Sequence, residues 1–163
     1  MIGSKVVLLS FLLVAGGPIT QAYRSPDRAI STDIVIASPT DCESKVAIRD
    51  RQRVLVEASY VSADHDHGQC VDVAKWSRDS QFFVYSVENA GGHQGWHDYI
   101  MIFSRSKGQL LSLDHYVPDP ITSVQFRLFG SHSIEFETTK IPLGGAPPRK
   151  IRMDLTTLTV MEP

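Results

Sequence analysis

Apolar and polar residues alternate along most of the chain with a period of two residues. This alternation, together with many aromatic and β-branched residues, is typical of short β-strands rather than helices. Clusters of turn-forming residues lie between the apolar stretches, at positions 78–80, 106–108, 130–131 and 144–148. The alternating stretches are residues 46–56, 82–87, 100–103, 110–113, 124–128, 134–137 and 151–155. The sequence therefore predicts an all-β domain, an antiparallel meander of short strands.

The strands also repeat along the chain. Apolar positions coincide at an offset of 52 residues, as for Trp76 with Leu128 and Phe82 with Ile134. A third, partial copy lies upstream, where residues 46–56 match the last hairpin of the unit. A period of about 50 residues with four strands per unit is typical of β-propeller blades.

Two stretches carry a resemblance to a known family. Residues 76–86, WSRDSQFFVYS, resemble the W-S-P-D-G opening of TolB-like β-propeller repeats, although Arg78 replaces the proline and Ser80 the glycine. Residues 99–113 resemble the second hairpin of the same repeats. The resemblance implies a blade at residues 71–114 and a looser one at 121–160, about two to two and a half blades in total.

A closed propeller usually needs four to eight blades, so two to two and a half blades do not determine how the sheets are arranged. The strands could form an incomplete stack of blades or collapse into a compact β-sandwich or barrel. Several copies of the chain could also assemble into a ring, and homo-oligomerisation stays an alternative. We expect a compact all-β monomer.

The N-terminal segment has the features of an export signal. A single cation, Lys5, precedes the apolar residues 6–15, and small residues lead to a cleavage point after Ala22. This order predicts a signal peptide over residues 1–22, and its apolar part is too short to remain as a transmembrane anchor. We expect residues 23–32 to be a flexible lead-in and residues 33–163 to be the domain. The predicted location is secreted or periplasmic.

The net charge of the chain bears on its possible binding partners, and its cysteine content bears on disulfide formation. Without residues 1–22 the chain has 15 basic and 18 acidic residues, and this mild acidic balance argues against nucleic acid as a partner. Cys42 and Cys70 are the only cysteines. In an exported chain such a pair is expected to form a disulfide, and the C-x-x-C spacing that would favour metal binding is absent.

The blade pattern predicts where the loops lie. Connections between the second and third strands of a blade, and between successive blades, share one face of the stack. Five of the six histidines fall on this face, and His132 falls on the opposite one. We predict that the loop face binds a protein or another envelope ligand through aromatic and imidazole side chains. The candidate binding residues are His93, Trp96, His97, His115 and Tyr116.

A metal site is the alternative use of the same histidines. His65 and His67 alternate, so on an extended strand they would share a face about 7 Å apart. His93 and His97 suit one ion only on a helix, which the glycines at 91, 92 and 95 disfavour. A zinc ion or a similar divalent ion would need His65 and His67 together with His93 or His97. No cofactor is expected otherwise.

Catalytic motifs are weak in this sequence. Neither G-x-S-x-G nor H-E-x-x-H occurs, and a triad of Ser86, His93 and Asp98 could be assembled only by assuming convenient loops. The favoured function is therefore an exported, non-enzymatic β-rich binding module of the cell envelope or extracellular space. A small metal-binding protein and a structural β subunit that assembles through edge strands are the alternatives.

Overall fold

The strands form three separate antiparallel sheets. A computed structural model describes residues 18–37, 42–63, 68–89, 97–139 and 147–159, and the statements below concern these residues. Sheet A contains β1–β4, sheet B contains β5–β8 and sheet C contains β9–β11. The strands are β1 Ile19–Arg24, β2 Ile30–Ile36, β3 Ser44–Asp50, β4 Arg53–Ser59, β5 Gln69–Trp76, β6 Phe82–Asn89, β7 Tyr99–Ser104, β8 Gln109–Ser112, β9 Arg127–Phe129, β10 Ser133–Thr138 and β11 Arg149–Asp154.

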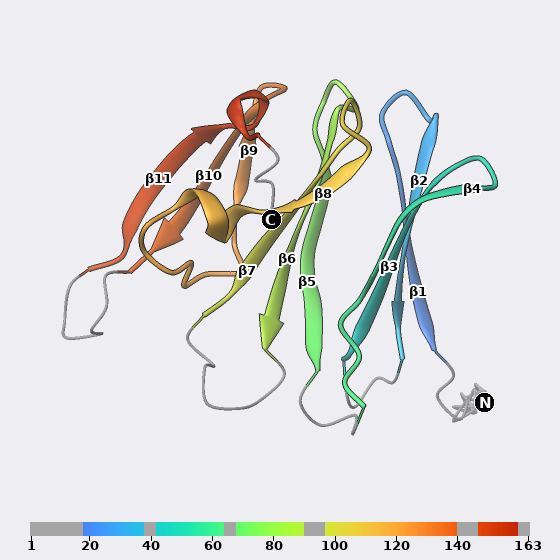
Figure 1. The fold of residues 1–163 in the computed structure, drawn as a ribbon, viewed down its shortest axis with the longest axis horizontal. Helices are drawn as coiled ribbons and strands as arrows, with labels where there is room; N and C mark the ends of the chain where they lie inside the picture. The colour runs from blue at the N-terminus through green and yellow to red at the C-terminus, as the bar shows by residue number, and fades with distance from the viewer. Residues whose placement is uncertain (1–17, 38–41, 64–67, 90–96, 140–146, 160–163) are drawn as a thin grey trace, which may run out of the picture.

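Each sheet is a meander in which strands adjacent in sequence pair with one another. Sheet B lies between sheet A and sheet C in the stack (Figure 1). Two short 3₁₀ helices, η1 Leu113–Tyr116 and η2 Leu155–Thr157, follow β8 and β11. The predicted all-β meander is confirmed, and the alternative of a two-sheet sandwich or barrel is wrong because the strands form three stacked open sheets.

The central sheet is buried on both faces. In β6, Phe82 and Val84 pack towards sheet C, whereas Phe83, Tyr85 and Val87 pack towards sheet A. All five side chains are at most 5% exposed. Because both faces of β6 are covered, this strand is apolar at nearly every position instead of alternating. Burial of each such large side chain contributes about 1.5–3 kcal/mol, so the two interfaces of sheet B are the main source of stability.

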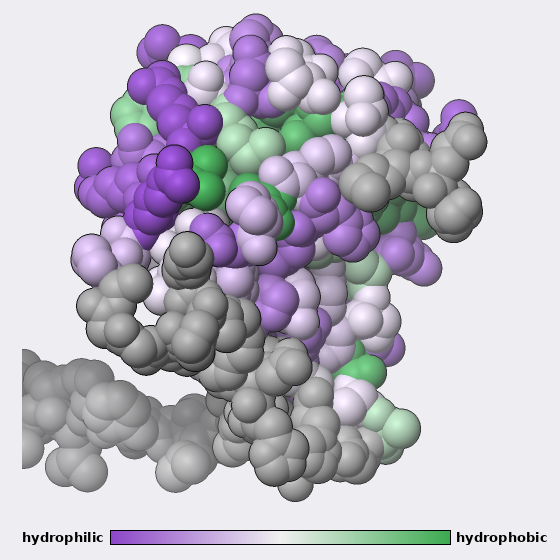
Figure 2. All heavy atoms as spheres, turned by 60° about the vertical axis from the view of Figure 1, so that its left-hand side comes forward, coloured by the Kyte–Doolittle hydropathy of each residue, from purple (hydrophilic) through white to green (hydrophobic). Residues whose placement is uncertain are grey.

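The faces at the two ends of the stack are polar. On sheet A, Arg49 and Asp33 form an ion pair with 2.6 Å between the guanidinium nitrogen and the carboxylate oxygen. On sheet C, the Arg152 guanidinium lies 4.5 Å from the centre of the Phe129 ring, and Lys150 lies 4.0 Å from Glu137. Hydrophilic residues cover much of the surface at this end of the molecule (Figure 2). Polar outer faces are what terminal units of a stacked array require in water.

Two turns of identical design link the first and second strands of sheets A and B. In sheet A, the Ser25 hydroxyl donates to Asp27 Oδ1 at 2.6 Å and accepts the Ile30 N–H at 3.0 Å. In sheet B, Ser77 has the same contacts with Asp79 at 2.7 Å and with the Phe82 N–H at 2.9 Å.

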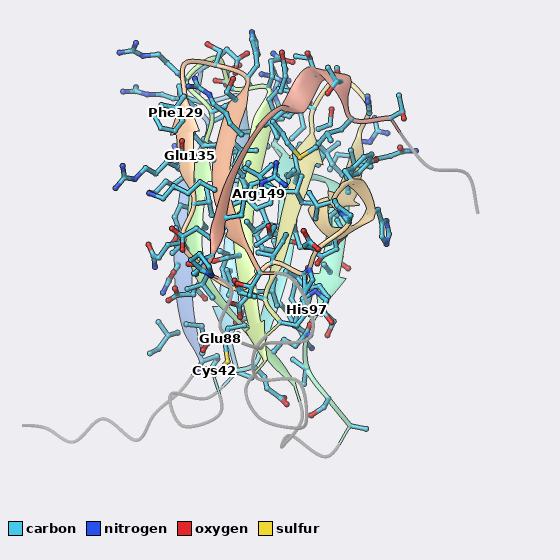
Figure 3. All side chains as sticks on the ribbon, turned by 90° about the vertical axis from the view of Figure 1, so that its left-hand side faces the viewer. Cys42, Glu88, His97, Phe129, Glu135 and Arg149 are labelled. Carbon is cyan, nitrogen blue, oxygen red and sulfur yellow. A yellow bond between two sulfur atoms is a disulfide. The ribbon has the colours of Figure 1, made fainter. Side chains whose placement is uncertain are left out.

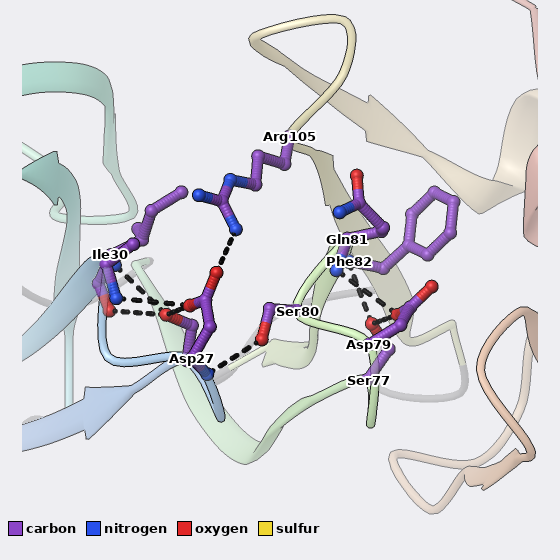
Figure 4. A network of polar contacts seen from close by, with 10 residues as sticks. Asp27, Ile30, Ser77, Asp79, Ser80, Gln81, Phe82 and Arg105 are labelled. Atoms are coloured by element: carbon purple, nitrogen blue, oxygen red, sulfur yellow. Dashed lines mark hydrogen bonds and ion pairs between the residues drawn. The ribbon is translucent and has the colours of Figure 1, made fainter.

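The two turns are also joined to each other and to neighbouring sheets. The Asp27 N–H donates to Ser80 Oγ at 3.0 Å, and Arg105 donates to Asp27 Oδ2 at 2.5 Å (Figure 4). Asp79 Oδ2 lies 3.2 Å from His132 Nδ1 of the sheet C turn. Each aspartate therefore closes its own turn with one oxygen and holds the next sheet with the other.

The expected lead-in at residues 23–32 is instead part of sheet A. Its residues form the end of β1, the Ser25–Asp27 turn and the start of β2, and β1 pairs with β2 along its whole length. The expectation failed because the first four residues of β1 are exposed and show no alternation. Ala22, the predicted cleavage position, lies within β1. Residues 1–17 lie outside the described residues.

The predicted disulfide between Cys42 and Cys70 is present, with 5.2 Å between the two Cα atoms. It connects the chain just before β3 to the start of β5 and therefore ties sheet A to sheet B. Among the described residues, no helix is both long and apolar enough to span a bilayer.

We expect the double variant Cys42→Ser/Cys70→Ser to unfold more easily. The disulfide closes a segment of 28 residues, and its removal should lower the free energy of unfolding by about 3–4 kcal/mol because the unfolded chain gains freedom. Urea unfolding followed by circular dichroism measures this change. A reductant should destabilise the native protein by a similar amount and leave the double variant unaffected; equal stability of the two proteins would contradict the prediction.

The Asp27 turn gives a pH-dependent prediction. The Ser25 hydroxyl, Arg105 and the Ala29 N–H hold the pKa of Asp27 well below its usual range, so the folded state favours the ionised carboxylate. This stability is present above the unfolded pKa of about 3.9 and is lost as the pH falls towards the folded pKa. Thermal unfolding should show Asp27→Asn less stable than the native protein at pH 7, with the difference shrinking below about pH 4.

Arg105→Gln is the matched control for Asp27→Asn, because it removes the cation and leaves the turn intact. It should reproduce only part of the loss. A loss that stays constant between pH 7 and low pH would show that the charge of Asp27 is not responsible.

Candidate functional site

The predicted loop face is only partly described. His65 and His67 fall in residues 64–67, and His93 and Trp96 fall in residues 90–96, all outside the described residues. His97, His115 and Tyr116 are described. The proposed metal set is therefore represented by His97 alone, and within the described ranges no three metal-binding side chains come together.

A contact between His97 and Asp114 joins the connection from β6 to β7 with the segment that follows β8. His97 immediately precedes β7, and Asp114 lies in η1 directly after β8. The distance between His97 Nε2 and Asp114 Oδ1 is 2.6 Å, and both side chains are mostly buried, at 21% and 16% exposed. The next residue, Asp98, donates its backbone N–H to the Ile121 carbonyl at 2.9 Å. The segment that enters β7 is thereby fixed to the segment that leaves β8.

The surroundings of the pair restrain it further. The His97 ring lies 4.5 Å from the Tyr99 ring, centre to centre, and the Ser112 hydroxyl donates to Asp114 Oδ2 at 3.2 Å. His97 lies at the same end of the molecule as Glu88 and Cys42, whereas Phe129 lies at the other end (Figure 3).

The two other described candidates differ from each other. His115 is exposed on η1, next to Asp114. Tyr116 is half-buried, and its hydroxyl donates to the backbone carbonyl of Thr159. Tyr116 therefore holds the segment after η2, while His115 is the described candidate available for contact with a partner.

A buried carboxylate anchors the neighbouring loop, and sequence reasoning missed it. Glu43 is 1% exposed and accepts hydrogen bonds from the Ser62 hydroxyl at 2.5 Å and the Gly68 N–H at 2.8 Å. A Cβ atom at Gly68 would lie 2.1 Å from Glu43 Oε1, so any other residue there would displace the buried Glu43 side chain. Glu43 thus holds both ends of the connection between sheets A and B. The available signal was a glutamate beside one cysteine and a glycine two positions before the other.

Asp98 has an unfavourable electrostatic environment. Burial, followed by repulsion from Glu88, raises the pKa of its carboxyl group, and His97 opposes this shift. Asp72 and Asp114 add to the repulsion. Several carboxylates therefore lie near Asp98 and disfavour its ionised form.

The arrangement does not match a nucleophilic triad. Ser112 donates its hydroxyl to Asp114, the same carboxylate that contacts His97, so the proton of Ser112 is directed at the carboxylate. Ser86, considered above as a nucleophile, is completely buried and accepts the Val73 N–H at 3.1 Å, at the irregularity in the pairing of β5 with β6. Its hydroxyl replaces a missing ladder bond. Neither serine has the surroundings that acyl transfer requires.

Comparisons with known proteins relate the chain to other proteins by fold alone. No protein-family model matches it, and no curated protein matches it. A solved structure from a mechanistic study of two prolyl endopeptidases is similar, with a TM-score of 0.50 and 14% sequence identity over 87% of this chain. The matched part is 19% of that protein. The likeness covers all-β sheets within a much larger enzyme and carries no activity to this chain.

Replacement of Asp98 tests the acidic surroundings. A raised pKa means that ionisation of Asp98 destabilises the folded protein, so this stability is complete below the unfolded pKa and is lost as pH rises through the folded pKa. We expect Asp98→Asn to raise the melting temperature at pH 7 and to have no effect below about pH 3. Glu88→Gln should give a smaller gain because burial remains. A lower melting temperature for Asp98→Asn at pH 7 would contradict this explanation.

Proposed function

We propose that the protein is an exported, non-enzymatic binding module built from three blade-like sheets, and that the loop face of sheet B binds a protein or another envelope ligand. The observation that carries this proposal is the His97–Asp114 contact, which fixes the connection before β7 against η1. A contact surface needs such preorganised loops, because each loop ordered only on binding would weaken the affinity.

The sequence around this contact supports the same conclusion. Trp96 directly precedes the anchored His97, and the exposed His115 directly follows Asp114. A tryptophan with neighbouring imidazoles gives a large contact area with polar groups, which is the composition of binding hot spots. The acidic groups around Asp98 favour a partner that presents cationic side chains there. The W-S-R-D-S stretch supports an assignment to TolB-like repeats.

The polar end faces support a self-contained stack of sheets over a ring of several copies. Ring closure by stacking would bury the Arg49–Asp33 pair and the charges of β10 and β11 between blades, and buried charges carry a large desolvation cost. The disulfide supports the secreted or periplasmic location.

Site-specific photo-crosslinking tests the loop face. A photoreactive amino acid in place of His115 should form an adduct with a partner in the exported fraction of the native host. The matched control replaces His132, which is half-exposed in the β9–β10 turn, at the end of the strands opposite to the loop face. Adducts from position 115 and not from position 132 support the proposal, because only the first position lies on the loop face.

The captured partner then allows a quantitative test. Trp96→Ala should weaken its binding at least tenfold, as expected for a central aromatic contact. Equal adducts from positions 115 and 132, or binding unaffected by Trp96→Ala, would show that the loop face is not the contact surface.

A further inference from the structure

We propose a second binding site, at the outer edge of β11, that takes an extended acidic segment of a partner protein as the missing fourth strand of sheet C. Sheets A and B each have four strands, whereas sheet C has three and ends with β11. No described strand pairs with the outer edge of β11, which lies at the outside of the stack (Figure 1). This proposal rests on the sheet edge and not on the His97–Asp114 contact, although Tyr116 of the loop face lines the same groove.

The chain itself is turned away from the vacant position. Asp154 caps η2 by accepting the Thr156 N–H at 2.9 Å, and the Leu155 N–H donates to the His132 carbonyl at 2.6 Å. Leu155 and Leu158 are then buried in the core between sheets B and C. After β3 and β7 the chain turns back and fills the fourth-strand position as β4 and β8, but after β11 these contacts direct it towards Lys107 and Tyr116.

A groove runs along the open edge. It has a volume of about 440 Å³ and is lined on one side by residues 149–153 and on the other by residues 116–119. Because five consecutive residues of β11 line it, the groove follows the strand edge and not one face of the sheet. The opposite wall cannot pair with β11 as a regular strand, since the prolines at 118 and 120 have no N–H to donate. Among the described residues, the hydrogen-bonding groups on the outer edge of β11 therefore have no strand partner.

The side chains of β11 indicate the chemistry of the occupant. Arg149, Lys150 and Arg152 are basic, although the whole chain has a net charge of −2. The Lys150 side chain is 64% exposed, and its nearest carboxylate, Glu137, is 4.0 Å away. Ile151 and Met153 alternate with Lys150 and Arg152 and pack against the core. An added strand with acidic and apolar residues in alternation would match both faces, because residues directly opposite in a sheet lie on the same face.

A second copy of this chain fits the edge less well than an acidic peptide. If two β11 strands paired antiparallel about Ile151, Lys150 of each copy would lie opposite Arg152 of the other. Pairing about Arg152 would place that residue opposite itself. Like charges directly opposite one another destabilise a sheet. The same basic residues would attract the carboxylates of an acidic strand, which is the mode of recognition known as strand addition.

The test uses a labelled heptapeptide of alternating glutamate and valine with the full chain. Fluorescence anisotropy should show saturable binding, and hydrogen exchange followed by NMR should show protection of alternate amides of β11. The variant Lys150→Glu/Arg152→Glu should bind about tenfold more weakly, because two cross-strand charge pairs become repulsive. The control variant Lys45→Glu/Arg53→Glu changes the net charge equally at exposed positions of sheet A and should bind normally. A peptide with proline in place of the central valine should also bind poorly.

Several results would overturn the proposal. Equal weakening in both double variants would mean general charge attraction, and binding without protection of β11 amides would place the peptide elsewhere. Absence of binding at millimolar peptide would mean that the basic residues only protect an exposed edge from aggregation. A dimeric mass of the free protein, abolished by Lys150→Glu/Arg152→Glu, would assign the edge to a second copy. Because position 115 is next to Tyr116 in the groove wall, crosslinks from position 115 that persist in Lys150→Glu/Arg152→Glu belong to the loop face, and crosslinks lost in this variant belong to the β11 edge.

Discussion

Burial of sheet B on both faces is the constraint on which the rest of the structure depends. β6 contributes Phe82 and Val84 to one core and Phe83 and Tyr85 to the other, so neither end sheet can be removed without exposing a large apolar surface. The order of the sheets follows from this fact. Sheets A and C each need one apolar face only, and their other faces carry the ion pairs and exposed charges that keep the stack from extending.

Apolar packing alone would allow neighbouring sheets to slide, and the Ser–Asp turns fix their relative position. Each turn aspartate is held by its own serine, so its second oxygen is oriented before it contacts the next sheet. The partners are Arg105 from the β7–β8 turn and His132 from the β9–β10 turn. These contacts lie at one end of the stack, and the Cys42–Cys70 disulfide ties sheets A and B near β3 and β5. The relative position of the sheets that carry the loops is thereby restrained both at the Ser–Asp turns and at the disulfide.

The sequence allowed the fold to be predicted where local signals are strong. The alternation in residues 134–137 and the apolar stretch in residues 82–87 correspond to β10 and β6, and residues 46–56 form β3 and most of β4 as expected. The Ser25–Pro26–Asp27 turn has the same contacts as the turn at Ser77, yet the exposed strand β1 before it shows no alternation that would predict it. The contacts of Glu43 with Gly68 and of His97 with Asp114 join residues 25 and 17 positions apart, and no local pattern encodes them.

The three-sheet stack has two kinds of terminal surface, the outer faces of its end sheets and the edges of its sheets, and each becomes compatible with water in a different way. A terminal face becomes compatible with water by substitution of side chains, as Glu135 and Glu137 illustrate on β10, because side chains are what a face presents. An edge presents backbone groups, which no substitution other than proline removes. In sheets A and B a fourth strand pairs with the edge of the third strand. In sheet C the chain after β11 instead places Leu155 and Leu158 in the core with sheet B. Because these residues are used for packing, they are not available for strand pairing, and within the described residues β11 therefore remains an edge of sheet C.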